Sequence, residues 1–597
     1  MATSNLAIVE FDAIKKMNNK SENLICQNCK SKFIIEPEDF NFYEKIKVPP
    51  PTFCPECRMI RRMSWRNEMS LYRRPCSASG HNETMISAFH PDEKIVIYDL
   101  RTWWSDEWDP LDFGRDYDFS RPFFEQWKEF RDSFPFQTVS NFNAANSEYC
   151  NVADDSKNCY LISGSSYCED TMYSNRVSKT KDCSDLYVVH RSELCYDDVI
   201  CNDCYHTLYS LSCKNCVDSY FLYDCVGCVN CFGCTNLRSK SYCMWNEQLS
   251  PPEYRRRLAE IDLVDYETIQ EYKNKFHLLY LKSIHRYANQ IKCINSTGDN
   301  VEGLKNSKEC FDIVDNTEDS KWVHWGAYDI KDAYDTGPGC GKVELIYEAF
   351  DTGLGNYRNL FTSVVYYSND IEYSFNCYSS SNLFACIGLR SKKYCVFNKQ
   401  YSKEEYERLI PKIIEHMNTM PYVDKMGRIY KYGEFFPVEF SPFTYNETVA
   451  QDYFPVTKKE ALKKGYRWRD RNLTDYKISI LAKDLPSKVD DSIIKEIIEC
   501  MHQGKCEDRC TGAFKIIQDE LNLYKRLKVP LPRLCFGCRH DERLRKRNPL
   551  KLWHRQCMCD KSNHNHEGNC KVEFETSYAP ERPEIVYCEK CYQQEVY

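Results

Sequence analysis

The sequence predicts a mainly β protein, with two β-solenoid-like repeat blocks and capping helices flanked by duplicated small zinc-binding modules of the zinc-ribbon or treble-clef type. Three observations lead to this expectation. The chain has 35 cysteines among 597 residues, the cysteines near both ends stand in close pairs, and those in the middle recur at a regular step. With 42% hydrophobic and 28% charged residues, the composition is that of a globular protein, which excludes a disordered or collagen-like chain.

The two ends of the chain are copies of one module. The pattern Tyr-x-x-x-Lys-Val-Pro-x-Pro-x-x-Cys-x-x-Cys begins at Tyr43 and recurs 481 residues later at Tyr524. Together with a cysteine pair upstream of each copy, it predicts two four-thiolate zinc sites. Four protein ligands leave no open coordination position, so such sites are structural; disulfides or unliganded thiols are the alternative. The expected ligands are Cys26, Cys29, Cys54 and Cys57 in the first copy and Cys506, Cys510, Cys535 and Cys538 in the second.

A third zinc site is expected in the C-terminal copy. Its ligands would be Cys557, Cys559, Cys588 and Cys591, with His564, His566 and Cys570 as competing ligands. At the matching positions the first copy keeps only Cys76, and it has Asp99 and Thr102 where Cys588 and Cys591 stand. We interpret this as a degenerate site held by packing, with Trp103 and Trp104 as candidates. The sequence therefore predicts about three Zn²⁺ per chain as the cofactor.

The middle of the chain is a ladder of cysteines. Fourteen lie between Asn143 and Cys243, many of them nine residues apart, as Cys150, Cys159 and Cys168 are. Nine is not a helical period, so we expect a stacked β-solenoid with nine residues per side and about eighteen per coil. We interpret most of these cysteines as small buried apolar residues. Metal binding by the run Cys225, Cys228, Cys231 and Cys234 is the alternative.

The repeat block is itself duplicated, because Leu-Arg-Ser-Lys-x-Tyr-Cys ends at Cys243 and again, 152 residues later, at Cys395. Ser250 and Ser402 each stand before a helix as N-cap candidates, and a short helix is expected near residues 491–499. The predicted order is an N-terminal zinc module (1–142), solenoid 1 (143–247), capping helices (248–291), solenoid 2 (292–400), a helix with an irregular connector (401–499), and a C-terminal zinc module (500–597).

Basic residues follow the second cysteine pair of each module at helical spacing. Phosphate contacts from such helices would give salt-dependent nucleic-acid binding. The alternative is a solvated basic face, or one that docks on the acidic solenoids of the same chain, whose net charge is −8. The candidate nucleic-acid-binding residues are Arg58, Arg61, Arg62, Arg66, Arg539, Arg543, Arg545, Lys546 and Arg547.

Catalytic motifs are weak. Asp335-Thr336-Gly337 and Asp351-Thr352-Gly353 match the paired carboxylates of aspartic proteases, which leaves a hydrolase as a remote alternative. The two motifs are only sixteen residues apart, and stacked polar turns explain that spacing better. We therefore expect no enzyme.

The chain resembles a loose group of uncharacterised cysteine-rich proteins with terminal zinc ribbons and a Cys/Tyr-repeat middle, and this resemblance implies no activity. We expect a non-catalytic zinc-binding scaffold or interaction protein whose modules bind nucleic acid or a protein partner. The alternative is a structural or assembly protein that uses its solenoid faces as interfaces. No apolar run spans a bilayer and no signal-peptide core is visible, so we expect a reducing, intracellular compartment and no membrane. The partner's identity and the oligomeric state stay open.

Overall fold

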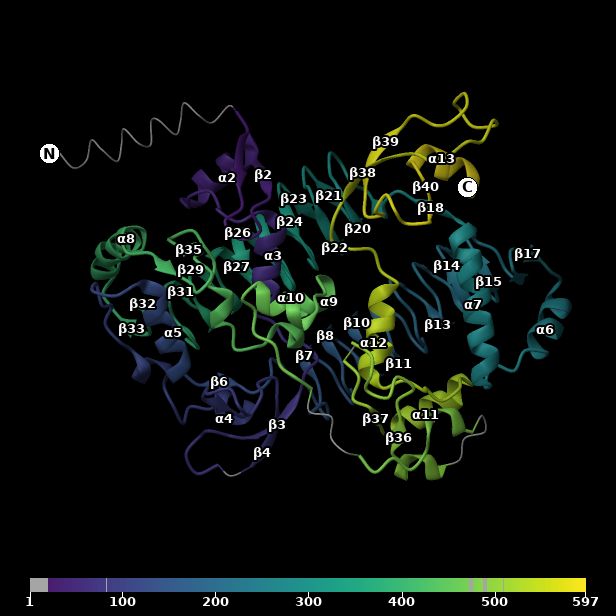
Figure 1. Ribbon diagram of the computed structural model, residues 1–597, viewed down its shortest axis with the longest axis horizontal. Coiled ribbons are helices and arrows are strands. Elements are labelled where there is room, and N and C mark those ends of the chain that lie inside the picture. The colour runs from purple at the N-terminus through teal and green to yellow at the C-terminus, as the bar shows by residue number, and fades with distance from the viewer. Residues whose placement is uncertain (1–19, 82, 472–475, 487–490, 508) are drawn as a thin grey trace. The chain divides into compact units, whose positions relative to one another are not determined.

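The computed structural model describes residues 20–81, 83–471, 476–486, 491–507 and 509–597 (Figure 1). Residues 1–19, in which we expected no signal-peptide core, lie outside the described residues. The chain divides into two compact units. Unit 1 combines residues 1–138 with 289–469, and unit 2 combines residues 139–288 with 470–597. Each unit thus joins one predicted zinc module to one predicted repeat block, and the predicted connector (401–499) is divided between them at residue 469.

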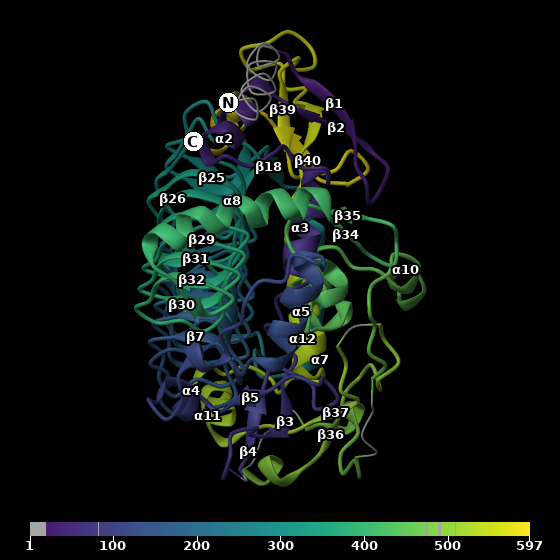
Figure 2. The same ribbon diagram turned by 90° about the vertical axis from the view of Figure 1, so that its left-hand side faces the viewer.

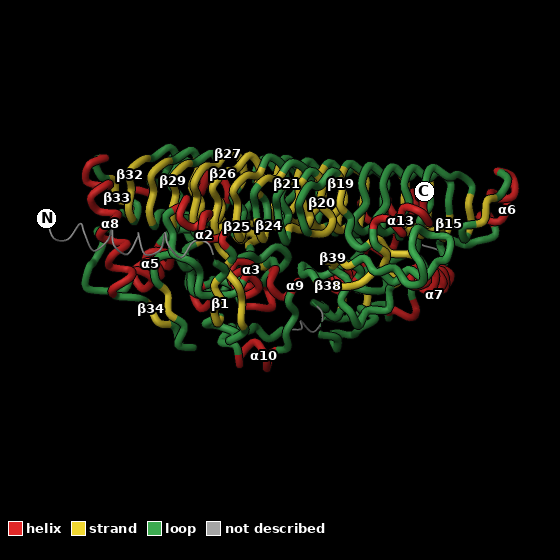
Figure 3. The backbone as a smooth tube through the Cα atoms, turned by 90° about the horizontal axis from the view of Figure 1, so that it is seen from above, coloured by secondary structure: helices red, strands yellow, loops and turns green. Residues whose placement is uncertain are grey.

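The repeat block of unit 2 is a ladder of short parallel strands. Ala153 pairs with Ser165, Asn175 with Tyr187, and Thr207 with Ser219, so each rung lies twelve residues after the one before it. Figure 3 shows the strands of each block stacked as successive rungs. The strands here are β7 (Asn151–Asp154), β8 (Ser163–Ser166), β9 (Glu169–Met172), β10 (Asn175–Ser178), β11 (Lys181–Ser184), β12 (Tyr187–His190), β13 (Tyr205–Leu208), β14 (Val217–Tyr223), β15 (Phe232–Thr235), β16 (Cys243–Met244) and β17 (Glu247–Gln248).

The underlying period of this block is three residues, not nine. Every third residue from Cys150 to Cys234 is buried, and two positions after each stands a residue with positive φ, such as Val152 (54°) or Asp155 (46°). Four such three-residue steps make one rung of twelve. The expectation of nine residues per side and about eighteen per coil was therefore wrong, because a nine-residue spacing samples every third buried position.

The repeat block of unit 1 follows the same plan with less regular rungs. Ile330 pairs with Val343, thirteen residues on, whereas Asn369 pairs with Ser381, twelve residues on. Its strands are β19 (Gln290–Ile291), β20 (Gly298–Glu302), β21 (Leu304–Lys305), β22 (Cys310–Ile313), β23 (Thr317–Glu318), β24 (Lys321–Val323), β25 (Ile330–Thr336), β26 (Cys340–Ala349), β27 (Gly353–Leu360), β28 (Ser363–Tyr366), β29 (Asn369–Glu372), β30 (Phe375–Tyr378), β31 (Ser381–Phe384), β32 (Lys393–Val396) and β33 (Lys399–Gln400).

A helix follows each block, as predicted. The Ser250 side chain accepts a hydrogen bond from Glu253 N at the start of α6 (Pro251–Ala259), which α7 (Tyr266–Lys282) follows. A capping box at Ser402 starts α8 (Lys403–Thr419), and α8 buries Ile413 and Met417 on its apolar face. The short helix expected near residues 491–499 is instead a 3₁₀ turn, Asp491–Lys495, followed by the strand β36 (Ile498–Glu499).

The two modules share one order of elements, a hairpin followed by two helices (Figure 2). In unit 1 these are β1 (Glu22–Ile25), β2 (Lys32–Ile35), α2 (Pro37–Ile46) and α3 (Pro55–Met63). In unit 2 they are β36, β37 (Ala513–Phe514), α11 (Gln518–Leu527) and α12 (Phe536–Arg545).

Smaller elements complete each unit. Unit 1 continues with β3 (Tyr72–Pro75), β4 (Thr84–Ser87), β5 (Ile97–Tyr98), α4 (Leu100–Trp104), α5 (Phe123–Ser133), β6 (Phe136–Gln137), β34 (Tyr422–Val423), β35 (Ile429–Tyr430), α9 (Val449–Tyr453) and α10 (Lys458–Lys463). Unit 2 continues with β18 (Ile284–Arg286), β38 (Trp553–Gln556), β39 (Glu573–Thr576), β40 (Ile585–Tyr587) and α13 (Glu589–Val596). Among the described residues, no helix has the length and apolar character needed to cross a bilayer.

Candidate metal centres

The first cysteine cluster forms where the β1–β2 hairpin meets the start of α3. The four predicted thiols Cys26, Cys29, Cys54 and Cys57 lie within 4.8 Å of one another. Cys54 is the N-cap of α3, and the Cys29 and Cys54 sulfur atoms are 3.7 Å apart, close to the separation of two ligands on a tetrahedral Zn²⁺. Hydrogen bonds from the Cys54 and Cys57 thiols hold the pKa of Cys26 far below its usual value. The cluster thus favours a thiolate, the form that binds metal.

The second cluster contains Cys500 where we expected Cys506. The ligand atoms that converge are those of Cys500, Cys510, Cys535 and Cys538, all buried. Cys500 directly follows β36, just as Cys26 directly follows β1. Hydrogen bonding from Cys500 is the main cause that lowers the pKa of Cys510 to about 6.

The displaced Cys506 is nonetheless close by. It lies on the longer hairpin turn of this copy and forms a separate group with His502 and Cys538. The search for close cysteine pairs in the sequence missed Cys500, because the hairpin turn of the second copy is seven residues longer than that of the first. Matching each hairpin by the strand that precedes its first cysteine would have found Cys500.

The third cluster contains Cys570, one of the competing ligands, in place of Cys559. Cys557, Cys570, Cys588 and Cys591 lie within 4.8 Å of one another and are all buried. Cys588 is the N-cap of α13, and its backbone N–H donates to the Cys557 sulfur over 3.1 Å. Cys559 belongs to another group, with His564, His566 and Cys591.

The corresponding site of the first copy is a hydrogen-bonded cluster. Cys76 donates to the Asp99 carboxylate over 3.3 Å, and the Thr102 hydroxyl donates to it over 2.7 Å. Burial opposes ionisation of Asp99, but the hydrogen bonds from Thr102 outweigh it and lower its pKa to about 2. A carboxylate and a hydroxyl thus stand where the second copy has Cys588 and Cys591. Trp103 is fully buried beside this cluster, whereas Trp104 is partly exposed.

The thiols of the buried ladder cysteines donate hydrogen bonds to backbone carbonyl oxygens. Cys225 donates to Tyr223 O and Cys231 to Val229 O, each two residues back along the chain. Cys228 and Cys234 do the same, to Val226 O and Phe232 O. These contacts are those of small buried residues, the reading that we favoured over metal binding for this run.

Most of the candidate nucleic-acid-binding residues lie in the interior, on α3 and α12. Arg58, Arg61 and Arg62 are at most 1% exposed, and Arg66, Arg539 and Arg543 are also buried. Lys546 is more exposed and pairs with Asp197. Arg545 is exposed and Arg547 is half-buried.

The carboxylates that meet these arginines stand in a vertical row of each repeat block, which we call the docking column. In unit 2 the column reads, one residue per rung, Asp185, Asp197, Tyr209, Phe221, Gly233 and Trp245. In unit 1 it reads Asp335, Glu348, Phe361, Tyr373, Ala385 and Phe397. Both columns have two acids, two aromatic residues, a small residue and an aromatic residue, in that order.

Each basic helix places two arginines, four residues apart, on the first acid of its column. In unit 1, Arg58 contacts Asp335 over 2.8 Å and Arg62 contacts it over 3.2 Å. In unit 2, Arg539 and Arg543 each contact Asp185 over 2.6 Å. Arg58 and Arg539 occupy the same position of the duplicated module, as do Arg62 and Arg543.

The second acid of each column also receives cations from the module. Arg61 and Arg62 lie against Glu348 in unit 1. In unit 2, Asp197 is held 3.0 Å from Lys546 and 2.6 Å from Lys273 of α7. Burial opposes ionisation of Asp197, but the charges of these lysines hold its pKa far below the usual value. The second acid therefore neutralises buried arginines in unit 1 and partly exposed lysines in unit 2.

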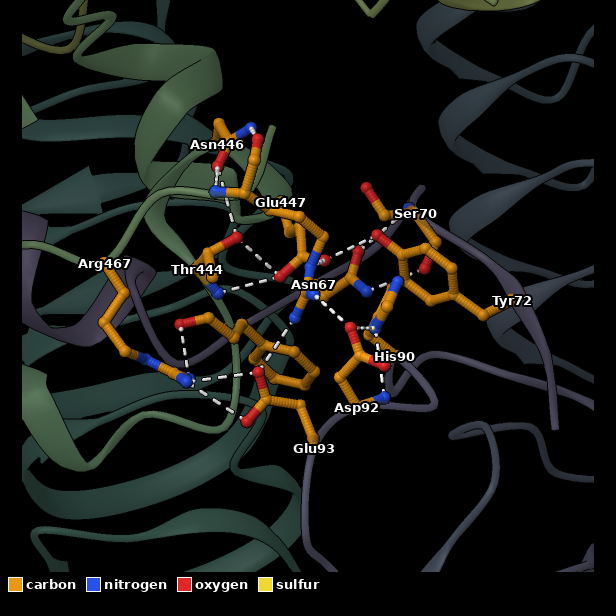
Figure 4. Close-up of polar contacts among 12 residues, drawn as sticks. Asn67, Ser70, Tyr72, His90, Asp92, Glu93, Thr444, Asn446, Glu447 and Arg467 are labelled. Atoms are coloured by element: carbon orange, nitrogen blue, oxygen red, sulfur yellow. Dashed lines mark hydrogen bonds and ion pairs between the residues drawn. The ribbon is translucent and has the colours of Figure 1, made fainter. Parts of the chain in front are cut away.

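A further polar cluster ties the connector of unit 1 to residues 67–93 (Figure 4). The Tyr72 hydroxyl donates to Glu447 over 2.5 Å, and Arg469 donates to the same carboxylate over 2.7 Å. Arg467 donates to Glu93 over 3.1 Å. Burial opposes ionisation of Glu447, yet the hydrogen bonds from Tyr72 and Thr444 and the charge of Arg469 keep its pKa below the usual value.

The two aspartates of the remote hydrolase reading are held by different arginines. Asp335 pairs with Arg58 and Arg62, and Asp351 pairs with Arg66 over 2.9 Å. Both carboxylates are buried. Ion pairing to separate guanidinium groups is a different arrangement from two carboxylates that share one proton.

No protein-family model matches this chain, and no curated protein matches it significantly in sequence.

Proposed function

We propose that this chain is a non-catalytic scaffold in which zinc-binding modules clamp two β-solenoids, one in each unit, and that the uncovered solenoid faces receive a protein partner. The observation that carries the proposal is the repeated clamp, in which an arginine pair of each module meets the first acid of its docking column. A contact kept in both copies of a duplicated arrangement indicates a structural role for the basic helices.

A bound zinc ion would fix the N-terminal end of each basic helix, because the helix starts at two of its cysteine ligands. Cys54 and Cys535 are the N-caps of α3 and α12, and Cys57 and Cys538 lie in their first turns. A structural Zn²⁺ contributes on the order of 10–16 kcal/mol of apparent folding free energy in small modules. The thiolate donor sets suit Zn²⁺, which four cysteines commonly bind in structural sites. Four sulfur ligands within tetrahedral reach also leave no coordination position for a substrate.

The repeat blocks supply the rigid part of the scaffold. Rungs of twelve or thirteen residues in parallel register support a solenoid. Exposed polar side chains also form hydrogen bonds from one rung to the next. Asn146 donates to Asn158, and Asn158 donates to Asp170, each over 3.1 Å. Such regular faces are the surfaces that repeat proteins offer to partners.

Nucleic-acid binding by the basic helices, which the sequence also predicted, has less support. Six of the nine candidate residues are buried. Five of these six lie on α3 and α12, and for those five to reach a phosphate the two helices would have to leave their docking columns. Buried carboxylates would then lose their partners, at a cost of several kcal/mol.

Two substitutions on α12 of the full chain separate these functions. Arg539→Gln should lower the unfolding temperature sharply, and Arg545→Gln, on the exposed side of the same helix, should leave it nearly unchanged. Filter binding of RNA and DNA is measured on both variants from low to high salt. Salt-dependent binding that both variants weaken, with little change in unfolding temperature for Arg539→Gln, would reject the scaffold.

A further inference from the structure

We propose that the third cysteine cluster, in the C-terminal module, holds a second zinc ion beside its four-cysteine site, bound by Cys559, His564, His566 and a shared Cys591. The ligand atoms of these four residues lie within 4.8 Å of one another. Cys591 also belongs to the neighbouring group of Cys557, Cys570 and Cys588. Two thiolates and two imidazoles make a donor set that suits tetrahedral Zn²⁺.

The loop that carries His564 and His566 buries little besides His564. Residues 560–569 form neither helix nor strand, and His564 is their only buried residue. A polar loop of this kind has no apolar contacts to offset the entropy of ordering it. A metal ion at His564 and His566 would supply the missing tie between the loop, β38 and α13.

The two imidazoles are oriented as metal ligands are. His564 places Nδ1 3.1 Å from the Cys559 sulfur, while its Nε2 lies 2.9 Å from the Glu595 carboxylate of α13. His566 donates from Nδ1 to Gly568 O over 2.8 Å, and its buried Nε2 has no hydrogen-bond partner. In His566 one nitrogen is held by an oxygen acceptor and the other is left for a ligand, the arrangement that outer-shell partners impose on metal-binding histidines. In His564, Nδ1 lies at the cysteine sulfur, and Nε2 lies beside a carboxylate without a hydrogen bond to it.

Sharing Cys591 also lowers the net negative charge of the two metal groups. A single Zn²⁺ with four thiolates carries two net negative charges, whereas two Zn²⁺ ions with the five thiolates of both groups carry one. The neutral imidazoles add none. The second ion would therefore stabilise the thiolates of the first group as well as Cys559.

Zinc content of the full-length protein tests the site. His566→Ala and His564→Ala should each hold one ion fewer per chain than the unaltered protein. The matched control is His554→Ala, in the same module, whose exposed ring bonds Glu573 and Glu575 and which should keep the full content. Equal zinc content in all four proteins would overturn the proposal.

The shared ligand has its own readout, which needs no variant. In protein loaded with ¹¹³Cd²⁺, the ions of the two groups should split each other's resonance through the Cys591 sulfur, and a spectrum without this splitting overturns the bridge. The bridge rests on the proposed zinc-bound modules, but the failures are distinguishable. A folded chain without any zinc rejects the scaffold as well, whereas loss of the second ion alone leaves it intact.

Discussion

Asp185→Asn should undock α12 from the repeat block of unit 2. The Asp185 side chain is 1% exposed, and each of its oxygen atoms lies 2.6 Å from an arginine, Arg539 or Arg543. The asparagine keeps the size of the side chain and removes its charge, so two buried guanidinium groups lose their shared counter-ion. Glu520, 3.6 Å from Arg539, supplies only part of the missing charge.

The expected loss follows from burial. Removing one partner of a buried ion pair costs about 3–5 kcal/mol, because the remaining charge stays out of water without compensation. Asp203→Asn is the matched control, since Asp203 lies in the same block, also has positive φ, and accepts two hydrogen bonds from Arg191. That pair is partly exposed, so its loss should cost at most about 1 kcal/mol.

Hydrogen exchange of the α12 amides measures this difference directly. At about 1.4 kcal/mol for each factor of ten, Asp185→Asn should speed their exchange by roughly two to three and a half orders of magnitude. Asp203→Asn should change it by less than about tenfold. If both variants exchange alike, the arginine clamp does not hold α12 and the reasoning is refuted.

Three further outcomes are expected. Cys500→Ser should release one zinc ion per chain and Cys506→Ser none, because only Cys500 joins the buried four-cysteine group; zinc analysis showing the reverse would restore the original ligand set. Leu222→Ala, in the fully buried interior of the ladder, should lower the free energy of unfolding by about 2–5 kcal/mol, whereas Tyr167→Ala, 57% exposed, should change it by about 0.5 kcal/mol or less; equal urea midpoints would contradict the interior assignment. Burial lowers the pKa of His285 to about 4, so the unfolded chain, with a histidine pKa near 6.5, binds more protons between these values. Stability should therefore fall as pH falls from about 6.5 to 4, by at most about 3.4 kcal/mol, and His285→Gln should reduce this slope in urea titrations; an unchanged slope would assign the acid sensitivity to other groups.

The terminal modules could be predicted from sequence because their constraints are local. A cysteine pair on a tight turn and another at a helix start fix four sulfur atoms within a short stretch, as Cys26 and Cys54 illustrate. The second copy defeats this rule where its turn lengthens and Cys500 lies outside a close pair. Spacing likewise could not separate Cys559 from Cys570, since that choice depends on how the loop of residues 560–569 folds back.

The repeat blocks were predictable in class but not in period. Nine-residue spacing excluded a helix, and parallel strands are present. Cysteine, however, is only one of the small residues that suit the interior, and Ala153 and Ser156 take the buried three-residue steps between Cys150 and Cys159. Reading all small residues together gives the three-residue step. The docking columns could not be predicted from the sequence, because they consist of residues twelve or thirteen positions apart that become neighbours only when the rungs stack.

Hydrogen exchange of the full chain before and after zinc removal tests the clamp most directly. With zinc bound, the amides of α3 and α12 should be protected together with the ladder strands of their own units. After chelation, with zinc loss verified on the same sample, both helices should lose protection while β10, β12, β29 and β31 retain theirs. If α3 and α12 stay as protected in the zinc-free chain as before, the metal does not hold the modules and the account is contradicted.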